Sequence, residues 1–229
     1  MNWKATVKHI IPAPILNNIL LAFPFLYRTK LLNYETNLKS PCVEELLSQL
    51  KLVLNVKGNI IECGSSRCGA TTIMAKYLQS ENIQKTIYAC DSFEGFSLTE
   101  LNRERKLGLT TALSSDFTST SYEYVKRKIR KLNVDDIIVI IKGFFQDTLP
   151  TLESDFCLAF IDCDLKDSII YCAETIWPNL ASKGRMVFDD YTFDACKGAR
   201  IGIDFFIDKH KEEILEHGLI NNLYYAHKK

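Results

Sequence analysis

The sequence predicts an α/β fold with a doubly wound, mostly parallel sheet and helices on both faces. Strand-like apolar runs alternate with stretches of helical apolar spacing along most of the chain. These runs are almost wholly apolar instead of alternating with polar residues, which is typical of strands buried on both faces of a parallel sheet. The chain has 229 residues, 47% of them hydrophobic and 24% charged, which suits one domain with a full core.

The predicted elements follow one another in the order expected of such a sheet. Helical spacing begins the domain at residues 43–54. Strands are predicted at 59–63, 86–90, 137–141, 156–161 and 185–188, and further helices at 70–79, 121–132, 167–180 and 198–211. Residues 223–225 predict a last strand at the sheet edge, with an antiparallel direction as one option. The polar stretch 96–120 shows no clear period and predicts a lid over a site.

Residues 1–40 predict a separate helical cap, lid or oligomer contact ahead of the main domain at 41–229. Pro12, Pro14 and Pro24 interrupt the apolar stretch 10–27. A membrane-spanning helix needs about 20 apolar residues and tolerates such breaks poorly. We therefore expect a helical cap or lid, or an oligomer contact such as that of a homodimer, and we keep a signal peptide or a peripheral membrane contact as alternatives.

Charge and cysteine content restrict the class of protein. Lys and Arg number 28, as do Asp and Glu, so the formal net charge of +0 gives no reason to expect a nucleic-acid partner. None of the eight cysteines forms a C-x-x-C pair, and no Cys/His cluster has zinc spacing. This usage indicates reduced thiols in a cytoplasmic protein.

The segment 59–72 predicts a strand, a glycine loop and a helix, the unit that cradles nucleotide-like ligands in doubly wound folds. Its pattern is Glu62-x-Gly64 with a wider gap to Gly69, and it differs from the dinucleotide pattern G-x-G-x-x-G. Glu62 would repel a pyrophosphate, which disfavours a nicotinamide-dependent oxidoreductase. An acidic residue there suits a ligand with a cationic amino acid end, such as S-adenosylmethionine. An ordinary β–turn–α connection is the alternative.

Acidic residues follow several of the predicted strands, at the edge where open α/β sheets bind ligands. Asp91 follows the second strand, where a carboxylate can accept hydrogen bonds from both ribose hydroxyls. Its alternative role is to cap the following turn.

The fourth and fifth strands end in Asp162 and in the pair Asp189-Asp190. Adjacent strand ends would bring these carboxylates together, and their charge then needs compensation. A hard divalent cation with oxygen ligands, such as Mg²⁺, fits this set. The alternative is that Asp164 and Asp190 only cap the segments that follow.

Four ordered segments resemble the macrocin/mycinamicin-type sugar O-methyltransferases, a TylF-like branch of the class I S-adenosylmethionine-dependent methyltransferases. They span roughly residues 40–210. The segments are Ile61-Glu-Cys-Gly-Ser-Ser-Arg-Cys-Gly69, Tyr88-Ala-Cys-Asp-Ser-Phe-Glu-Gly95, Lys142-Gly-Phe-Phe-Gln-Asp-Thr-Leu-Pro150, and Phe160-Ile-Asp-Cys-Asp164 with Asp189-Asp-Tyr191. The resemblance implies a Rossmann-like sheet of seven strands.

The resemblance also implies a role for each matching position. Glu62 and Gly64 would lie along the methionine part of S-adenosylmethionine, and Ser65 and Gly69 belong to the same loop. Asp91 would hold the ribose. The remaining implied contacts are Ser92 and Phe93 near the adenosine, Gly143 and Phe144 at the adenine edge, and Asp162, Asp189 and Asp190 around Mg²⁺.

The implied reaction is methylation of a sugar hydroxyl in a glycosylated natural product or glycan. Asp162 is the candidate general base because it can touch both cation and hydroxyl. Catechol-type methyltransferases place a lysine three residues after the first metal-binding Asp, but here that position is Leu165, and Lys166 is expected to be an exposed side chain. A catechol-like O-methyltransferase and a non-catalytic protein that keeps the fold are the alternatives.

Overall fold

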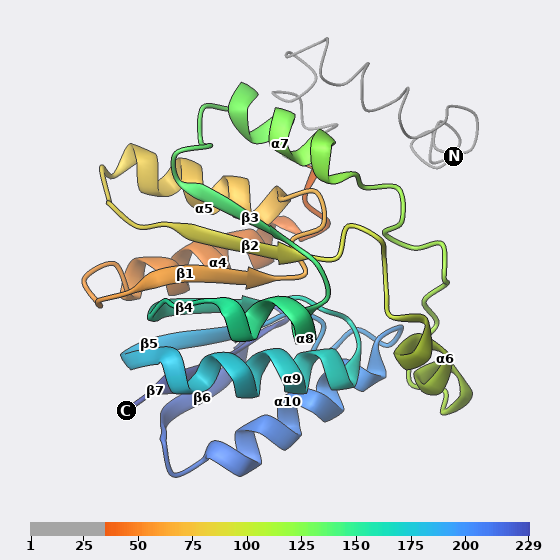
Figure 1. Cartoon of the computed structure of the whole chain (residues 1–229). Helices are drawn as coiled ribbons and strands as arrows, with labels where there is room; N and C mark the ends of the chain where they lie inside the picture. The colour runs from red at the N-terminus through yellow and green to blue at the C-terminus, as the bar shows by residue number, and fades with distance from the viewer. Residues whose placement is uncertain (1–34) are drawn as a thin grey trace.

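The computed structural model describes residues 35–229, and these form a mixed seven-stranded sheet with helices on both faces (Figure 1). The strand order is β3-β2-β1-β4-β5-β7-β6. The first five strands run parallel, and β7 pairs antiparallel with both β5 and β6. The strands are β1 (Asn59–Cys63), β2 (Ile87–Asp91), β3 (Ile138–Lys142), β4 (Phe156–Ile161), β5 (Leu180–Phe188), β6 (Ile214–Ile220) and β7 (Leu223–Lys228). The predicted doubly wound, mostly parallel sheet of seven strands is confirmed.

The helices form a layer on each face of the sheet, and one helix stands apart (Figure 1). One layer consists of α4 (Ser40–Leu52), α5 (Gly69–Ser80) and α7 (Tyr122–Lys131). The opposite layer consists of α8 (Phe145–Thr148), α9 (Lys166–Ile176) and α10 (Lys197–His210). The remaining helix, α6 (Leu98–Lys106), stands beyond the carboxyl ends of the strands.

The alternation of side chains along each strand divides the core into two clusters. Ile60 packs with α4, α5 and α7, whereas its neighbour Ile61 packs with α9 and α10. Successive strand residues point to opposite faces, so a strand buried on both faces must be apolar at every position. This explains the continuous apolar runs that predicted a parallel sheet.

Two elements differ from the sequence prediction. The stretch 96–120 contains helix α6, whose buried positions are Glu100, Leu101 and Glu104. Because this helix buries two acids, it shows no apolar period. The other element is β6, an edge strand with exposed side chains that joins β7 through Asn221 and Asn222. Both asparagines have positive φ, as a two-residue hairpin turn requires. The last strand therefore lies inside the sheet, and the prediction of an edge position for it was wrong.

The predicted helix at 167–180 is shorter than expected. Helix α9 ends at Ile176, and a 3₁₀ turn at Trp177–Asn179 contains Pro178, which cannot continue an α-helix. Strand β5 then starts at Leu180, five residues before the predicted start at residue 185.

The predicted unit at 1–40 falls almost wholly outside the described residues. Its roles as a cap, lid, dimer contact or membrane contact stay predictions. Between residues 35 and 229, no helix combines the length and the apolar character that a membrane crossing requires.

Candidate active site

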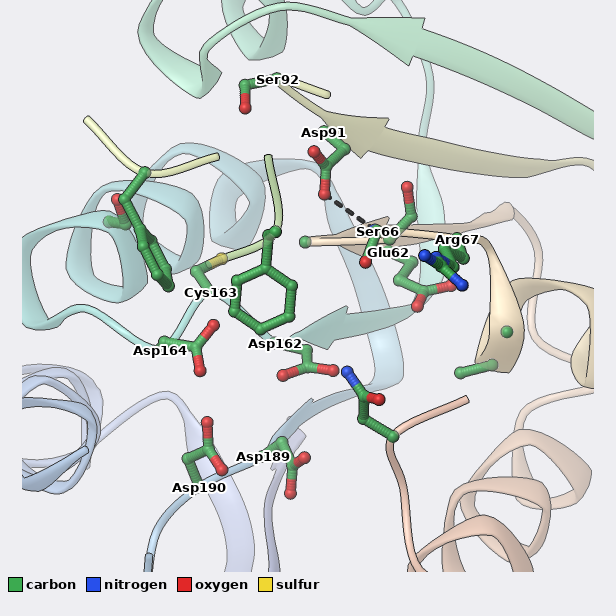
Figure 2. Close-up of a pocket in the computed structure, with 18 of the residues that line it drawn as sticks. Glu62, Ser66, Arg67, Asp91, Ser92, Asp162, Cys163, Asp164, Asp189 and Asp190 are labelled. Atoms are coloured by element: carbon green, nitrogen blue, oxygen red, sulfur yellow. Dashed lines mark hydrogen bonds between the residues drawn. The ribbon is translucent and has the colours of Figure 1, made fainter. Parts of the chain in front are cut away.

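A cavity of about 350 Å³ opens at the carboxyl ends of the parallel strands (Figure 2). This is the edge at which ligands bind in open α/β sheets, and the volume is in the range of small-molecule sites. The predicted site residues that line it are Glu62, Gly64, Ser65, Gly69, Asp91, Ser92, Gly143, Phe144, Asp162, Asp189 and Asp190.

The loop after β1 is held in a conformation that needs glycine at position 64. Gly64 has φ +90°, and a Cβ there would lie 1.8 Å from the carbonyl oxygen of Asp162. The same loop contains Ser66 and Cys68 with positive φ, and α5 begins directly after it. The loop therefore exposes backbone to the cavity next to the start of a helix, as a ligand cradle requires.

Asp91 joins the end of β2 to this loop. One carboxylate oxygen, Oδ2, accepts a hydrogen bond of 2.8 Å from the backbone N–H of Ser66, drawn as a dashed line in Figure 2. The other, Oδ1, accepts a bond of 2.7 Å from the N–H of Phe93. Burial raises the pKa of Asp91. Each oxygen keeps a further lone pair, so the carboxylate can still accept from the hydroxyls of a ribose.

Glu62 and Ser65 place a buried acid and a buried hydroxyl in the cavity wall. Glu62 is 2% exposed and accepts a hydrogen bond from the Thr71 hydroxyl. Burial raises the pKa of Glu62 to about 8, so a cationic partner would stabilise its ionised form. The Ser65 hydroxyl is buried and has no hydrogen bond among the described residues. An ammonium group at Glu62 and a carboxylate at Ser65 would satisfy both, which fits the amino acid end of S-adenosylmethionine.

Of the two residues after β2 that were expected near the adenosine, one lines the cavity and the other has its side chain in the core. Ser92 lines the cavity, whereas the Phe93 side chain packs against Tyr122 in the core, with ring centroids 5.8 Å apart. Phe93 thus acts on this region through its backbone N–H, which binds Asp91. Gly143 and Phe144 line the cavity after β3.

The predicted cation ligands lie together on the side of the cavity opposite Asp91 (Figure 2). Carboxylate oxygens of Asp162, Asp189 and Asp190 all lie within 4.8 Å of one another. Burial, followed by the charge of Asp189, raises the pKa of Asp162 well above its usual value. Burial and neighbouring acids likewise raise the pKa values of Asp189 and Asp190 to about 7. Three hard oxygen donors with unfavourable mutual charge fit a divalent cation such as Mg²⁺.

A fourth acid, Asp164, extends this cluster. Oxygens of Asp164 and Asp190 and the sulfur of Cys196 also lie within 4.8 Å of one another. The Cys196 thiol donates to Asp164 Oδ1 at 3.6 Å. Asp164 has φ +62°, a left-handed conformation that turns the chain between β4 and α9. The sequence predicts three or four neighbouring carboxylates at these strand ends, with capping as the alternative role of Asp164.

Residues 35–39 belong to the unit predicted as a cap or lid, and they form a wall of the cavity whose individual residues the sequence did not indicate. Glu35 pairs with Arg67 Nη1 and with Lys128 Nζ, each at 3.1 Å, and accepts a hydrogen bond of 2.5 Å from the Tyr124 hydroxyl. Thr36 lies against Gly69, where a Cβ would come within 2.5 Å of the Thr36 Cα. These contacts join residues far apart in the sequence, so no local pattern indicates them.

Two further wall residues come from segments whose structure the sequence did not indicate. Asn222 belongs to the β6–β7 turn, and Phe193 follows the acidic pair after β5. The Asn221-Asn222 pair is a hairpin signal that could have located the first. Lys166, in contrast, is absent from the cavity wall, and its Nζ lies 3.3 Å from Asp167 Oδ1. Its side chain is 31% exposed, so it is half-buried and not fully exposed as expected.

A family model and two curated relatives indicate the same protein family for this chain. A family model described as Macrocin-O-methyltransferase (TylF) matches residues 38–217. Demethyldecarbamoylnovobiocin O-methyltransferase of Streptomyces niveus is 29% identical over 167 residues, which cover 69% of this chain and 60% of the relative. Mycinamicin III 3''-O-methyltransferase of Micromonospora griseorubida is 26% identical over 183 residues, covering 76% and 69%. The match thus spans less than two-thirds of the Streptomyces niveus protein.

Solved structures show the same fold. The O-methyltransferase NovP matches with a TM-score of 0.75 over 95% of this chain and 99% of its own, at 21% identity. The calicheamicin methyltransferase CalS11 matches with a TM-score of 0.69 over 94% and 91%, at 16% identity. The seven-stranded mixed sheet is therefore the Rossmann-like fold of class I methyltransferases.

Proposed function

The chain belongs to the macrocin O-methyltransferase (TylF) family, and from this premise we propose that it methylates a sugar hydroxyl of a glycosylated natural product or glycan, with S-adenosylmethionine as methyl donor and a divalent cation. The reaction converts the hydroxyl and S-adenosylmethionine into a methyl ether, S-adenosylhomocysteine and a proton. The names of the two curated relatives support the substrate class, since both describe O-methylation in natural-product chemistry.

One observation carries the proposal. The glycine loop and the three-acid cluster share a single cavity, and Gly64 touches the backbone of Asp162. A donor on the glycine loop would thus lie beside a hydroxyl held at the acids. Methyl transfer needs this arrangement, because the acceptor oxygen must approach the methyl carbon opposite the departing sulfur.

Different residues of the chain would bind different parts of the donor and the cation. Glu62 and Ser65 would hold the ammonium and carboxylate groups of the donor, and Asp91 its ribose. Ser92, Gly143 and Phe144 would flank the adenosine. A cation held by Asp162, Asp189 and Asp190 would supply Lewis acidity that lowers the pKa of the acceptor hydroxyl.

Asp162 is the proposed proton acceptor. Its half-buried carboxyl group lies in the acid cluster, where it could contact both a bound cation and an acceptor hydroxyl held there. The described part of the cavity wall contains no histidine. Lys166 does not line the cavity either, so a catechol-type role for Lys166 is not supported.

The test is methyl transfer from S-[methyl-³H]adenosylmethionine to a panel of acceptors in the presence of Mg²⁺. The panel pairs glycosylated aromatic and macrolide compounds with their aglycones and with simple catechols. We expect label only on the glycosylated compounds, and NMR should place the new methyl group on a sugar oxygen. Label only on catechols would favour the catechol-like alternative. Binding of the donor without any transfer would favour a non-catalytic role.

A further inference from the structure

Two buried glutamates attach helix α6 to the first turn of helix α9. Glu100 Oε1 accepts from the backbone N–H of Ser168 at 2.7 Å, and Oε2 accepts from the Ser168 hydroxyl at 2.8 Å. Glu104 Oε1 accepts from the backbone N–H of Lys166 at 2.5 Å. Both acids are almost wholly buried, with exposed fractions of 6% and 2%.

Helix α9 depends on these acids because it has no cap of its own. Its N-cap position is Leu165, whose side chain cannot accept a hydrogen bond. The first N–H groups of a helix have no partner within the helix, and leaving them buried and unpaired is costly. The two glutamates of α6 satisfy N–H groups in the first turn, and their negative charge is favourable at a helix N-terminus.

The chain that leaves α6 makes a second attachment, to the start of helix α10. The backbone N–H of Thr111 donates to the Ala195 carbonyl at 3.0 Å, and that of Gly198 donates to the Leu109 carbonyl at 3.1 Å. The free oxygen of Glu104, Oε2, lies directly against Gly198, where a Cβ would be 2.3 Å away. Glu104 is therefore in contact with the first turns of both α9 and α10.

Each of these helix starts follows closely on a group of acids. Asp162 and Asp164 lie in the loop that leads from β4 into α9, and Asp189 and Asp190 lie in the loop that leads from β5 into α10. Glu104 of helix α6 contacts both of the helix starts that follow these acid-bearing loops. We propose that Glu100 and Glu104 are positioning residues that hold the two acid-bearing loops in the geometry required for cation binding.

This inference rests on the cation of the proposed function, and it adds that the site depends on a helix which touches none of the three ligands. If the two glutamates were only general stabilising contacts, their loss would weaken every ligand alike. If they position the acid loops, their loss weakens cation binding and leaves the glycine loop intact. A general stabilising role therefore predicts that both affinities fall, whereas a positioning role predicts that the affinity for the cation alone falls.

The first experiment measures two affinities in Glu104→Ala and in Glu100→Ala. Mn²⁺ binding is followed by electron paramagnetic resonance, and S-adenosylhomocysteine binding by calorimetry. We expect Mn²⁺ affinity to fall about tenfold or more, as when other groups that orient metal ligands are removed. Affinity for S-adenosylhomocysteine should stay at the wild-type value. An equal loss of both affinities, or unchanged Mn²⁺ affinity, would overturn the proposal.

Matched variants separate hydrogen bonding from helix stability. Glu104→Gln keeps an acceptor oxygen for the Lys166 N–H, so we expect it to restore Mn²⁺ affinity. Arg103→Ala removes an exposed ion pair between the same two helices, to Asp167, and we expect no loss of Mn²⁺ affinity. Positioning by the buried carboxylates would be contradicted if Glu104→Gln did not restore Mn²⁺ affinity. It would also be contradicted if Arg103→Ala lowered Mn²⁺ affinity as much as Glu104→Ala does.

Amide hydrogen exchange tests the attachment without any cation. In Glu104→Ala, we expect faster exchange in peptides that cover residues 162–170 and unchanged exchange in residues 59–69. Unchanged exchange in 162–170 would overturn the attachment. A wild-type protein that binds S-adenosylhomocysteine but no Mn²⁺ would refute the cation part of the proposed function and the positioning role with it. The hydrogen-exchange data would then show only whether the glutamates of α6 stabilise the start of α9.

Discussion

Gly64 and Asp162 are in backbone contact, and the Asp162 N–H donates to the Cys63 carbonyl at 2.8 Å. They follow adjacent parallel strands, β1 and β4, so they reach the same edge of the sheet. One residue belongs to the glycine loop and the other to the acid cluster. The proposed donor half and cation half of the cavity therefore meet at this backbone contact, and changing the contact itself should affect both.

Replacement of Gly64 by Ala tests this contact. A Cβ at 1.8 Å from a backbone oxygen forces the two loops apart, so we expect loss of S-adenosylhomocysteine binding and of Mn²⁺ binding together. The free energy of unfolding should also fall by more than about 2 kcal/mol, measured by urea denaturation. Gly108→Ala is the matched control, because Gly108 also has positive φ but has nothing within 4 Å of its Cβ position. If Gly64→Ala behaved like this control, the two halves would be independent.

Asp190→Asn tests the cation cluster. We expect the melting temperature of the variant to lose its response to Mg²⁺ and methyl transfer to fall by about 100-fold, the upper end of the effects seen on disturbing metal sites. Asp194 is exposed, lies four residues further along the chain and lines no part of the cavity, so Asp194→Asn should behave like the wild type. A Mg²⁺ response that persists in Asp190→Asn would exclude this residue as a ligand.

The stability of the cation-free protein should fall as pH rises. Burial raises the pKa values of Asp189 and Asp190 to about 7, above the value of about 3.9 for an unfolded aspartate. The folded state therefore holds protons that the unfolded state releases, and stability present near pH 4 is lost as pH rises through 7.

Mg²⁺ should reverse this loss, because it replaces the protons as the compensating charge. We expect the rise in melting temperature on adding Mg²⁺ to be larger at pH 8 than at pH 5.5, measured by differential scanning fluorimetry. A rise of equal size at both values would mean that the cation does not bind at titrating carboxylates. Asp190→Asn serves again as the control and should show a weaker dependence on pH.

Lys166→Met tests whether Lys166 takes part in catalysis. Its ammonium group contacts Asp167 and does not line the cavity, so activity should stay within about twofold of the wild type. The measurement is the initial rate of methyl transfer over a range of pH. A large loss of rate with a shifted pH profile would restore the catechol-type mechanism.

Sequence patterns predict the parts of this structure that local chemistry determines. Strands buried on both faces are apolar at every position, and the glycine loop needs Gly64 for both its φ and its close approach, so each is visible in the sequence. Ligands bind at the carboxyl ends of the strands in such sheets, so the acids there could be predicted to form a cluster. Asp162, Asp189 and Asp190 do lie together in the structure. Phe93 shows the limit, since only its backbone reaches the site.

Elements stabilised by distant partners were not predictable in this way. Helix α6 buries Glu100 and Glu104, which read as solvent-exposed residues until the uncapped start of α9 is placed against them. Glu35 reaches the site through ion pairs with residues more than 30 positions away. The edge strand β6 has little apolar pattern because it has few side chains to bury.

Calorimetric titration of S-adenosylhomocysteine into the purified protein tests the central claim most directly, with Asp91→Ala in parallel. Asp91 accepts hydrogen bonds from the loop and faces the proposed ribose position, so its loss should weaken binding by about tenfold or more. Circular dichroism of the variant would show that the fold is kept. Saturable binding to the wild type with this loss in the variant is the predicted result. No binding to a well-folded wild-type protein would contradict the assignment of a methyltransferase activity.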